Sequence, residues 1–302
     1  MAHSPNYERL AIVADALAAI NAPALPSYEL GKLIFLKGLL SGATSPKQEY
    51  KSIIESILGV RLLAPLGKSR AYLIFGRASA SPAEIVCSLD PFAYMSHLSA
   101  MEHHGLTDRF AKILYMTRPP AVEWRRQAVA RMEKDLDGKL EQYKIAGLPA
   151  LTMPKISAIG RTVVHFQERS QLGAFRNVSD TSLRVATIGR VFLDMLREPK
   201  LCGGMQHVLD VYKRDAKRYL KLIVEEIDRH GQPIDKVRAG YVLSEVCELQ
   251  YPVFQEWESF VQRGGSRKLD PDEEFATHYS ERWKLSINVP SLASMASDFD
   301  DG

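Results

Sequence analysis

The stretch from Ser45 to Gly59 constrains the fold more than any other part of the chain. Ser45 can cap a helix, Pro46 suits the first helical position, and Gln48 completes a capping box. The apolar residues that follow have the i, i+3, i+4, i+7, i+8 spacing of one helical face: Tyr50, Ile53, Ile54, Ile57 and Leu58. We therefore expect a helix with one buried and one exposed face.

The segments around this helix predict a small helical module that ends in a hairpin. Residues 7–20 and 28–40 are rich in helix-favouring or apolar residues and predict two earlier helices. Residues 61–75 contain two short apolar runs around a glycine-containing turn, which is a hairpin pattern. Three helices followed by a hairpin is the order of a winged helix-turn-helix. We predict such a DNA-binding domain over residues 1–78.

In a winged helix the third helix enters the major groove and the hairpin contacts the nearby backbone. Lys47 and Lys51 lie one turn apart and would neutralise phosphates, and the Gln48 amide could read an adenine edge. Two further cations lie at the predicted hairpin tip. The candidate DNA-binding residues are Lys47, Gln48, Lys51, Ser52, Lys68 and Arg70. The alternative is the ordinary solvated face of a small helical domain.

The distribution of charge agrees with an anionic partner. The net charge is only +3, but residues 1–78 carry +4 and the remainder carries −1. Such an asymmetry favours DNA as a partner only mildly.

The larger part of the chain mixes helices and strands. Residues 83–295 are predicted to form a mixed α/β C-terminal domain, so the fold class is α+β. Residues 121–143 have dense, mixed charge and predict a solvated helix. We expect a helix from residue 90 to Gly105.

Composition and cysteine usage predict a cytoplasmic protein with no membrane partner. No apolar run approaches the roughly 18–20 residues needed to cross a bilayer. The three cysteines, Cys87, Cys202 and Cys247, are far apart and odd in number, which favours reduced and mostly buried thiols.

Sequence motifs for catalysis, metal or cofactor binding are not recognisable. His97, His103 and His104 have spacings that place them on different helical faces, so packing and capping explain them better than zinc does. The run Cys202-Gly203-Gly204 lacks the Lys-Ser/Thr of a phosphate loop. We therefore predict no catalytic residue, no metal site and no cofactor.

A second basic surface is predicted on the helix over residues 206–229. Its five cations fall within about 140° of a helical wheel: Lys213, Arg214, Lys217, Arg218 and Lys221. They could contact nucleic acid or a partner protein. Alternatively, the pairs Asp210–Arg214 and Lys221–Glu225 simply solvate the helix.

Two motifs carry a resemblance to a known family. The first runs Ser96-His97-Leu98-Ser99-Ala100 and ends in His104-Gly105-Leu106-Thr107. The second is Leu193-Asp194-Met195-Leu196, followed by Pro199 and Cys202-Gly203-Gly204. In this order, behind a basic N-terminal segment, they resemble the AbiEi antitoxins of bacterial type IV toxin–antitoxin systems over about residues 27–250.

The resemblance implies a repressor that binds inverted repeats in its own promoter. It also implies an antitoxin that neutralises a nucleotidyltransferase toxin encoded beside it, without a stable complex between the two proteins. An alternative from another class is an enzyme that processes nucleic acid or nucleotides through the C-terminal domain. That alternative requires a cluster of carboxylates, which the linear sequence does not reveal.

Overall fold

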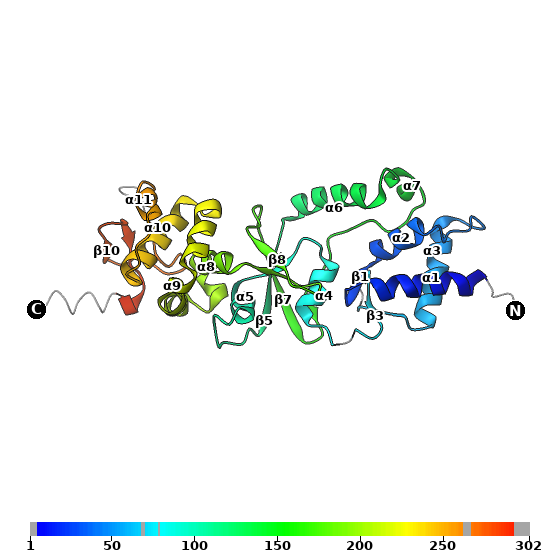
Figure 1. Ribbon diagram of the computed structural model, residues 1–302, viewed down its shortest axis with the longest axis horizontal. Coiled ribbons are helices and arrows are strands. Elements are labelled where there is room, and N and C mark those ends of the chain that lie inside the picture. Colours follow the sequence, from blue (N-terminus) through cyan, green and yellow to red (C-terminus); the bar gives the residue numbers. More distant parts are fainter. Residues whose placement is uncertain (1–4, 68–69, 78, 262–266, 293–302) are drawn as a thin grey trace, which may run out of the picture. The chain divides into compact units, whose positions relative to one another are not determined.

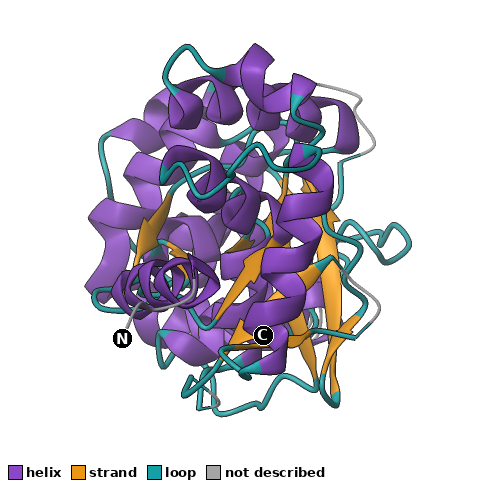
Figure 2. Cartoon of the chain, turned by 90° about the vertical axis from the view of Figure 1, so that its right-hand side faces the viewer, coloured by secondary structure: helices purple, strands orange, loops and turns teal. Residues whose placement is uncertain are grey.

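The computed structural model describes residues 5–67, 70–77, 79–261 and 267–292. The chain forms two compact units, each built from several stretches of sequence. The first contains the described residues of 1–94, 117–172 and 177–184, and the second those of 95–116, 173–176 and 185–302. Helices and strands occur together along the chain, so the fold class is α+β (Figure 2). The first unit extends beyond residue 78, and separate folding of residues 1–78 stays a prediction.

The first unit begins with a three-helix, three-strand module (Figure 1). Its elements are α1 (Pro5–Ala19), β1 (Ala24–Pro26), α2 (Ser27–Leu36), α3 (Pro46–Gly59), β2 (Leu63–Pro65) and β3 (Ala71–Ile74). The strands form an antiparallel sheet in the order β1-β3-β2, with Pro26 opposite Ala71 and Pro65 opposite Tyr72. The predicted hairpin is confirmed, whereas β1 was not expected.

The core of this module lies between its helices and its sheet. Leu30 and Ile34 of α2 are fully buried with Ile57 of α3, and Ile53 and Ile54 are buried beside them. Helix α3 starts at Pro46 and ends at Gly59, so its predicted bounds and apolar face are confirmed. The expected capping box does not form, because the Ser45 hydroxyl donates to Gln48 Oε1 at 3.0 Å instead.

Three more helices complete the helical part of the first unit: α4 (Pro82–Leu89), α6 (Ala121–Leu136) and α7 (Leu140–Ile145). The helix predicted over 121–143 is confirmed as α6 over residues 121–136, but it is interrupted before α7 and a stripe along it is buried rather than solvated. Trp124 and Leu136 are fully buried, in a cluster that includes Tyr28 of α2 and Tyr143 of α7. Between its many charged residues, α6 carries an apolar stripe at helical spacing, and this stripe packs into the core.

A six-stranded sheet has the order β6-β7-β5-β4-β9-β8. Its strands are β4 (Tyr94–Met95), β5 (Ile113–Arg118), β6 (Ala158–Ile159), β7 (Thr162–Glu168), β8 (Phe175–Asn177) and β9 (Arg184–Ala186). Strand β4 runs parallel to β9 with Met95 opposite Val185, and β6 and β7 form a tight antiparallel hairpin. The helix expected from residue 90 instead begins at His97, because β4 precedes it.

The second unit is mainly helical. Its helices are α5 (His97–His103), α8 (Ile188–Arg197), a 3-10 turn (Pro199–Cys202), α9 (Met205–His230), α10 (Pro233–Tyr241), a π-helical turn (Val242–Val246) and α11 (Val253–Glu258). Two short strands, β10 (Tyr279–Ser280) and β11 (Leu285–Ser286), pair near its end. None of the described helices has both the length and the apolar composition for a membrane span.

Candidate nucleic-acid interface

Helix α3 presents four of the predicted contact residues on one exposed face. Lys47, Gln48, Lys51 and Ser52 are all exposed, while the opposite face is buried in the core of the module. This arrangement follows from the sequence, since the four positions fall on an arc of about 140° whose Lys47 edge adjoins the apolar stripe. The face offers two cations, an amide and a hydroxyl to a partner.

The electrostatics of this face are not purely basic. Lys51 Nζ lies 3.8 Å from Glu55 Oε1, and both side chains are mostly exposed, at 78% and 66%. A pair of this kind in solvent is weak, contributing about 0.3–0.5 kcal/mol. The Lys51 ammonium can therefore exchange Glu55 for a phosphate at little cost.

A buried carboxylate fixes the turn that leads into α3. Glu49 accepts hydrogen bonds from the backbone N–H groups of Thr44 at 3.1 Å and Ser41 at 2.5 Å. The Thr44 N–H, together with that of Ser41, holds the pKa of Glu49 below its ordinary value. The turn between α2 and α3 thus has a defined conformation, which sets the direction of α3 relative to α2. Sequence reasoning missed this role.

The hairpin supplies one described cation. Lys68 lies outside the described residues, whereas Arg70 is described and its side chain is exposed. The Arg70 carbonyl accepts hydrogen bonds from the Ser27 N–H and the Ser27 hydroxyl, each at 2.9 Å. The turn of the hairpin is therefore attached to the first residue of α2, and the Arg70 side chain takes no part in that attachment.

Helices α6 and α7 support the module from within the same unit. The Tyr28 hydroxyl and Lys32 Nζ both donate to Asp135 Oδ2, at 3.1 and 3.0 Å. The end of α7 lies beside the first turn of α3, because a Cβ on Gly147 would be 4.0 Å from Lys47 Cβ. The Lys47 end of the exposed face of α3 is thus bordered by Gly147, a neighbour that sequence reasoning did not identify.

The second predicted basic surface lies on α9, and its five cations are exposed. Arg214 is held by Asp215 at 2.6 Å and by the Leu106 carbonyl at 2.7 Å. The expected Asp210–Arg214 pair is therefore replaced, and Asp210 accepts from Gln206 at 3.1 Å instead. Lys221 lies 3.9 Å from Glu225, as expected.

The remaining members of this basic surface are Lys213, Lys217 and Arg218, of which Arg218 stacks over the Tyr219 ring at 5.1 Å. All three side chains are exposed. Two of the five cations, Arg214 and Lys221, thus have an acidic neighbour within ion-pair distance.

The two sequence motifs contact each other in the second unit. His97, which has φ of 50° and is fully buried, bridges Ser96 Oγ and Glu198 Oε2 through its two ring nitrogens, each at 2.8 Å. Arg109 donates to the Gly203 carbonyl at 2.8 Å. These contacts give His97 a packing role, as predicted, and join the end of α8 to the start of α5.

Helix α8 also contains an ion pair that the sequence analysis missed. The Arg190 and Asp194 side chains are 1% and 0% exposed, and Arg190 Nε lies 2.9 Å from Asp194 Oδ1. Among the described residues, no group of three or more His, Cys, Asp or Glu side chains is arranged to hold a metal ion.

Comparisons with known proteins add little. No protein-family model matches the chain, and no curated protein matches it. The chain is similar to the crystal structure of the RV2827C protein from Mycobacterium tuberculosis, with a TM-score of 0.46 and 13% identity, over 96% of this chain and 95% of that one.

Proposed function

We propose that residues 1–78 form a winged helix-turn-helix that binds double-stranded DNA. The observation that carries this proposal is the exposed face of α3, on which Lys47, Gln48, Lys51 and Ser52 lie together. The order β1, α2, α3, β2, β3 and the sheet order β1-β3-β2 support it, because the hairpin follows directly on the helix. In this proposal α3 enters the major groove and the hairpin residues Lys68 and Arg70 contact the flanking backbone.

We further propose that the protein is a cytoplasmic transcriptional repressor and antitoxin, without catalytic activity of its own. This part rests on the resemblance of the motifs around His97 and Leu193 to the AbiEi antitoxins. It implies promoter DNA with inverted repeats as the ligand and a nucleotidyltransferase toxin as the functional partner, without a stable complex. Expression of such a neighbouring toxin with and without this protein tests the antitoxin role, and equal toxicity in both cases would contradict it.

The DNA proposal is tested by titrating duplex DNA from the region upstream of the gene with the purified protein. We expect saturable binding that weakens steeply as salt rises, since each phosphate contact releases counterions. Substituting Gln48→Ala should relax the preference at one base position and cost about 1–3 kcal/mol on the preferred sequence. Unchanged affinity and sequence preference in this variant would argue against α3 as the reading element.

A further inference from the structure

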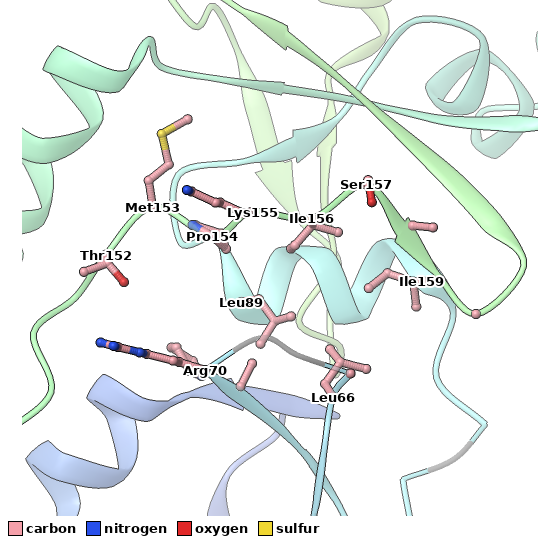
Figure 3. Close-up of a pocket in the computed structure, with 15 residues that line it drawn as sticks. Leu66, Arg70, Leu89, Thr152, Met153, Pro154, Lys155, Ile156, Ser157 and Ile159 are labelled. Atoms are coloured by element: carbon pink, nitrogen blue, oxygen red, sulfur yellow. The ribbon is translucent and has the colours of Figure 1, made fainter.

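A cleft in the first unit lies between the hairpin and the segment 152–160 (Figure 3). Its volume is about 800 Å³, within the size range of small-molecule sites. The hairpin side contributes Leu66, Gly67 and Arg70, and the other side contributes Thr152 to Gly160. Sequence reasoning assigned no role to residues 152–160.

The cleft combines an apolar interior with two cations. Leu66 comes from the hairpin side, Ile156 and Ile159 come from the other side, and Leu89 lies between them in Figure 3. Leu89 and Ile159 are almost completely buried. Arg70 and Lys155 come from opposite sides, and both side chains are exposed. The described residues that line the cleft include neither Asp nor Glu. A ligand there meets two positive charges that no lining carboxylate neutralises.

The segment that carries Lys155 is held in place by the sheet beside it. Arg118 donates to the Pro154 carbonyl at 3.3 Å, and its guanidinium lies 4.0 Å above the Phe166 ring. Arg118 also pairs with Glu168 at 3.3 Å. Because these contacts hold the backbone at Pro154, this side of the cleft is ordered before any ligand binds, which lowers the entropic cost of binding.

We propose that this cleft binds a small organic anion with a flat apolar body. The apolar body would lie against the partly exposed Leu66 and Ile156, and the anionic group would lie between Arg70 and Lys155. Thr152 and Ser157, which are both exposed, add hydroxyl donors at two places along the same side of the cleft. Anions paired with guanidinium or ammonium donors form the stronger class of hydrogen bonds, so charge selects the ligand.

Binding in this cleft also affects DNA, a consequence that rests on the proposed function. Arg70 is both a lining residue and a proposed backbone contact of the hairpin. A ligand that engages the Arg70 guanidinium competes with a DNA phosphate for the same donors. The ligand is thus an inhibitor of DNA binding, and by linkage DNA weakens the ligand equally.

The site is tested first on the free protein by calorimetric titration with naphthalene-2-sulfonate. We expect one saturable site with a dissociation constant of about 1 mM or lower, typical of a ligand of this size. The neutral naphthalene-2-sulfonamide should bind about tenfold more weakly, because it lacks the charge. No saturation, or equal affinity for the two compounds, would overturn the proposal.

Variants assign the binding to the cleft. Arg70→Gln and Lys155→Gln should each weaken sulfonate binding about tenfold, whereas Lys155→Arg should retain it. Lys134→Gln is the matched control, since Lys134 is an exposed residue of α6 outside the cleft. Equal weakening by Lys134→Gln, or no weakening by Lys155→Gln, would show that the sulfonate binds elsewhere. Thermal unfolding of each variant verifies that the fold is intact.

The competition is tested separately with duplex DNA. At ten times its dissociation constant, the sulfonate should weaken DNA binding about elevenfold in the wild type and much less in Lys155→Gln. Unchanged DNA affinity would overturn the competition. If the protein bound no DNA at all, the proposed function would fail, while the titrations of the free protein would still decide whether the cleft is a ligand site.

Discussion

Ser27 donates both its backbone N–H and its hydroxyl to the Arg70 carbonyl, each at 2.9 Å. The first residue of α2 thereby holds the turn of the hairpin through the backbone of Arg70, and the guanidinium remains exposed. The stabilising contact and the proposed DNA contact therefore use different atoms of the same residue, and they can be separated by mutation.

Arg70→Ala should weaken DNA binding without destabilising the protein. The carbonyl that Ser27 uses is retained, whereas the charge that would contact a phosphate is lost. Ser27→Ala should do the reverse and lower the free energy of unfolding by about 1 kcal/mol through loss of one hydrogen bond. Denaturant unfolding and DNA titration of both variants check this, and a matching loss of stability in Arg70→Ala would contradict the assignment.

Glu55→Gln should strengthen DNA binding about two- to threefold. The carboxylate lies 3.8 Å from Lys51 Nζ on the face proposed to meet phosphates, so its removal relieves repulsion and releases Lys51. The gain should disappear at high salt, where exposed charges are screened. An unfolded or damaged variant cannot bind more tightly, so this direction is informative. Weaker or unchanged binding at low salt would place the DNA elsewhere.

Glu49→Gln should destabilise the protein by about 1–2 kcal/mol near neutral pH, because hydrogen bonds to a charged acceptor are lost. The Thr44 and Ser41 N–H donors lower the pKa of Glu49 in the folded state, from 4.5 in the unfolded chain. A carboxylate of this kind stabilises the fold above the unfolded pKa and loses that contribution as pH falls through the lower folded pKa.

The difference in stability between the wild type and Glu49→Gln should therefore be constant above about pH 5 and shrink as pH falls below 4.5. Denaturant unfolding of both proteins over pH 3 to 7, a range of about four units around the titration, measures it. A difference that stays the same across this range would exclude Glu49 as a charged anchor of the turn.

Arg190→Met should be strongly destabilising, by about 3–5 kcal/mol, because it leaves the buried Asp194 carboxylate without its partner. Adding Asp194→Leu should recover much of the loss, since an apolar pair of similar size can replace a buried ion pair. Denaturant unfolding of the single and double variants gives the comparison. A double variant less stable than Arg190→Met alone would show that Asp194 has a different structural role.

The elements with a strong local signal could be predicted from the sequence. The spacing of Tyr50, Ile53 and Ile57 gave α3 with its correct bounds, and the apolar runs around Gly67 gave the hairpin. Strand β1 was missed because it has three residues and ends in Pro26, and proline is usual only at sheet edges. Its pairing with β3 depends on residues almost fifty positions away, which local patterns do not report.

The buried polar groups illustrate a second limit of structure prediction from the sequence. A glutamate in a helix is usually exposed, so the sequence gives no sign that Glu49 is buried. Only the hydrogen bonds from the Ser41 and Thr44 N–H groups identify its role. Arg190 and Asp194 did leave a signal, an i,i+4 charge pair within a mostly apolar helix. The cleft left none, because its walls come from segments that the sequence separates by about eighty residues.

The most direct test of the proposed DNA face is the salt dependence of binding for Lys47→Gln/Lys51→Gln, measured by fluorescence anisotropy on upstream duplex DNA. Loss of two phosphate contacts should lower the affinity and reduce the slope of log affinity against log salt by about 1.8. The control Lys134→Gln should match the wild type in both quantities. A double variant with the affinity and salt slope of the wild type would contradict the account.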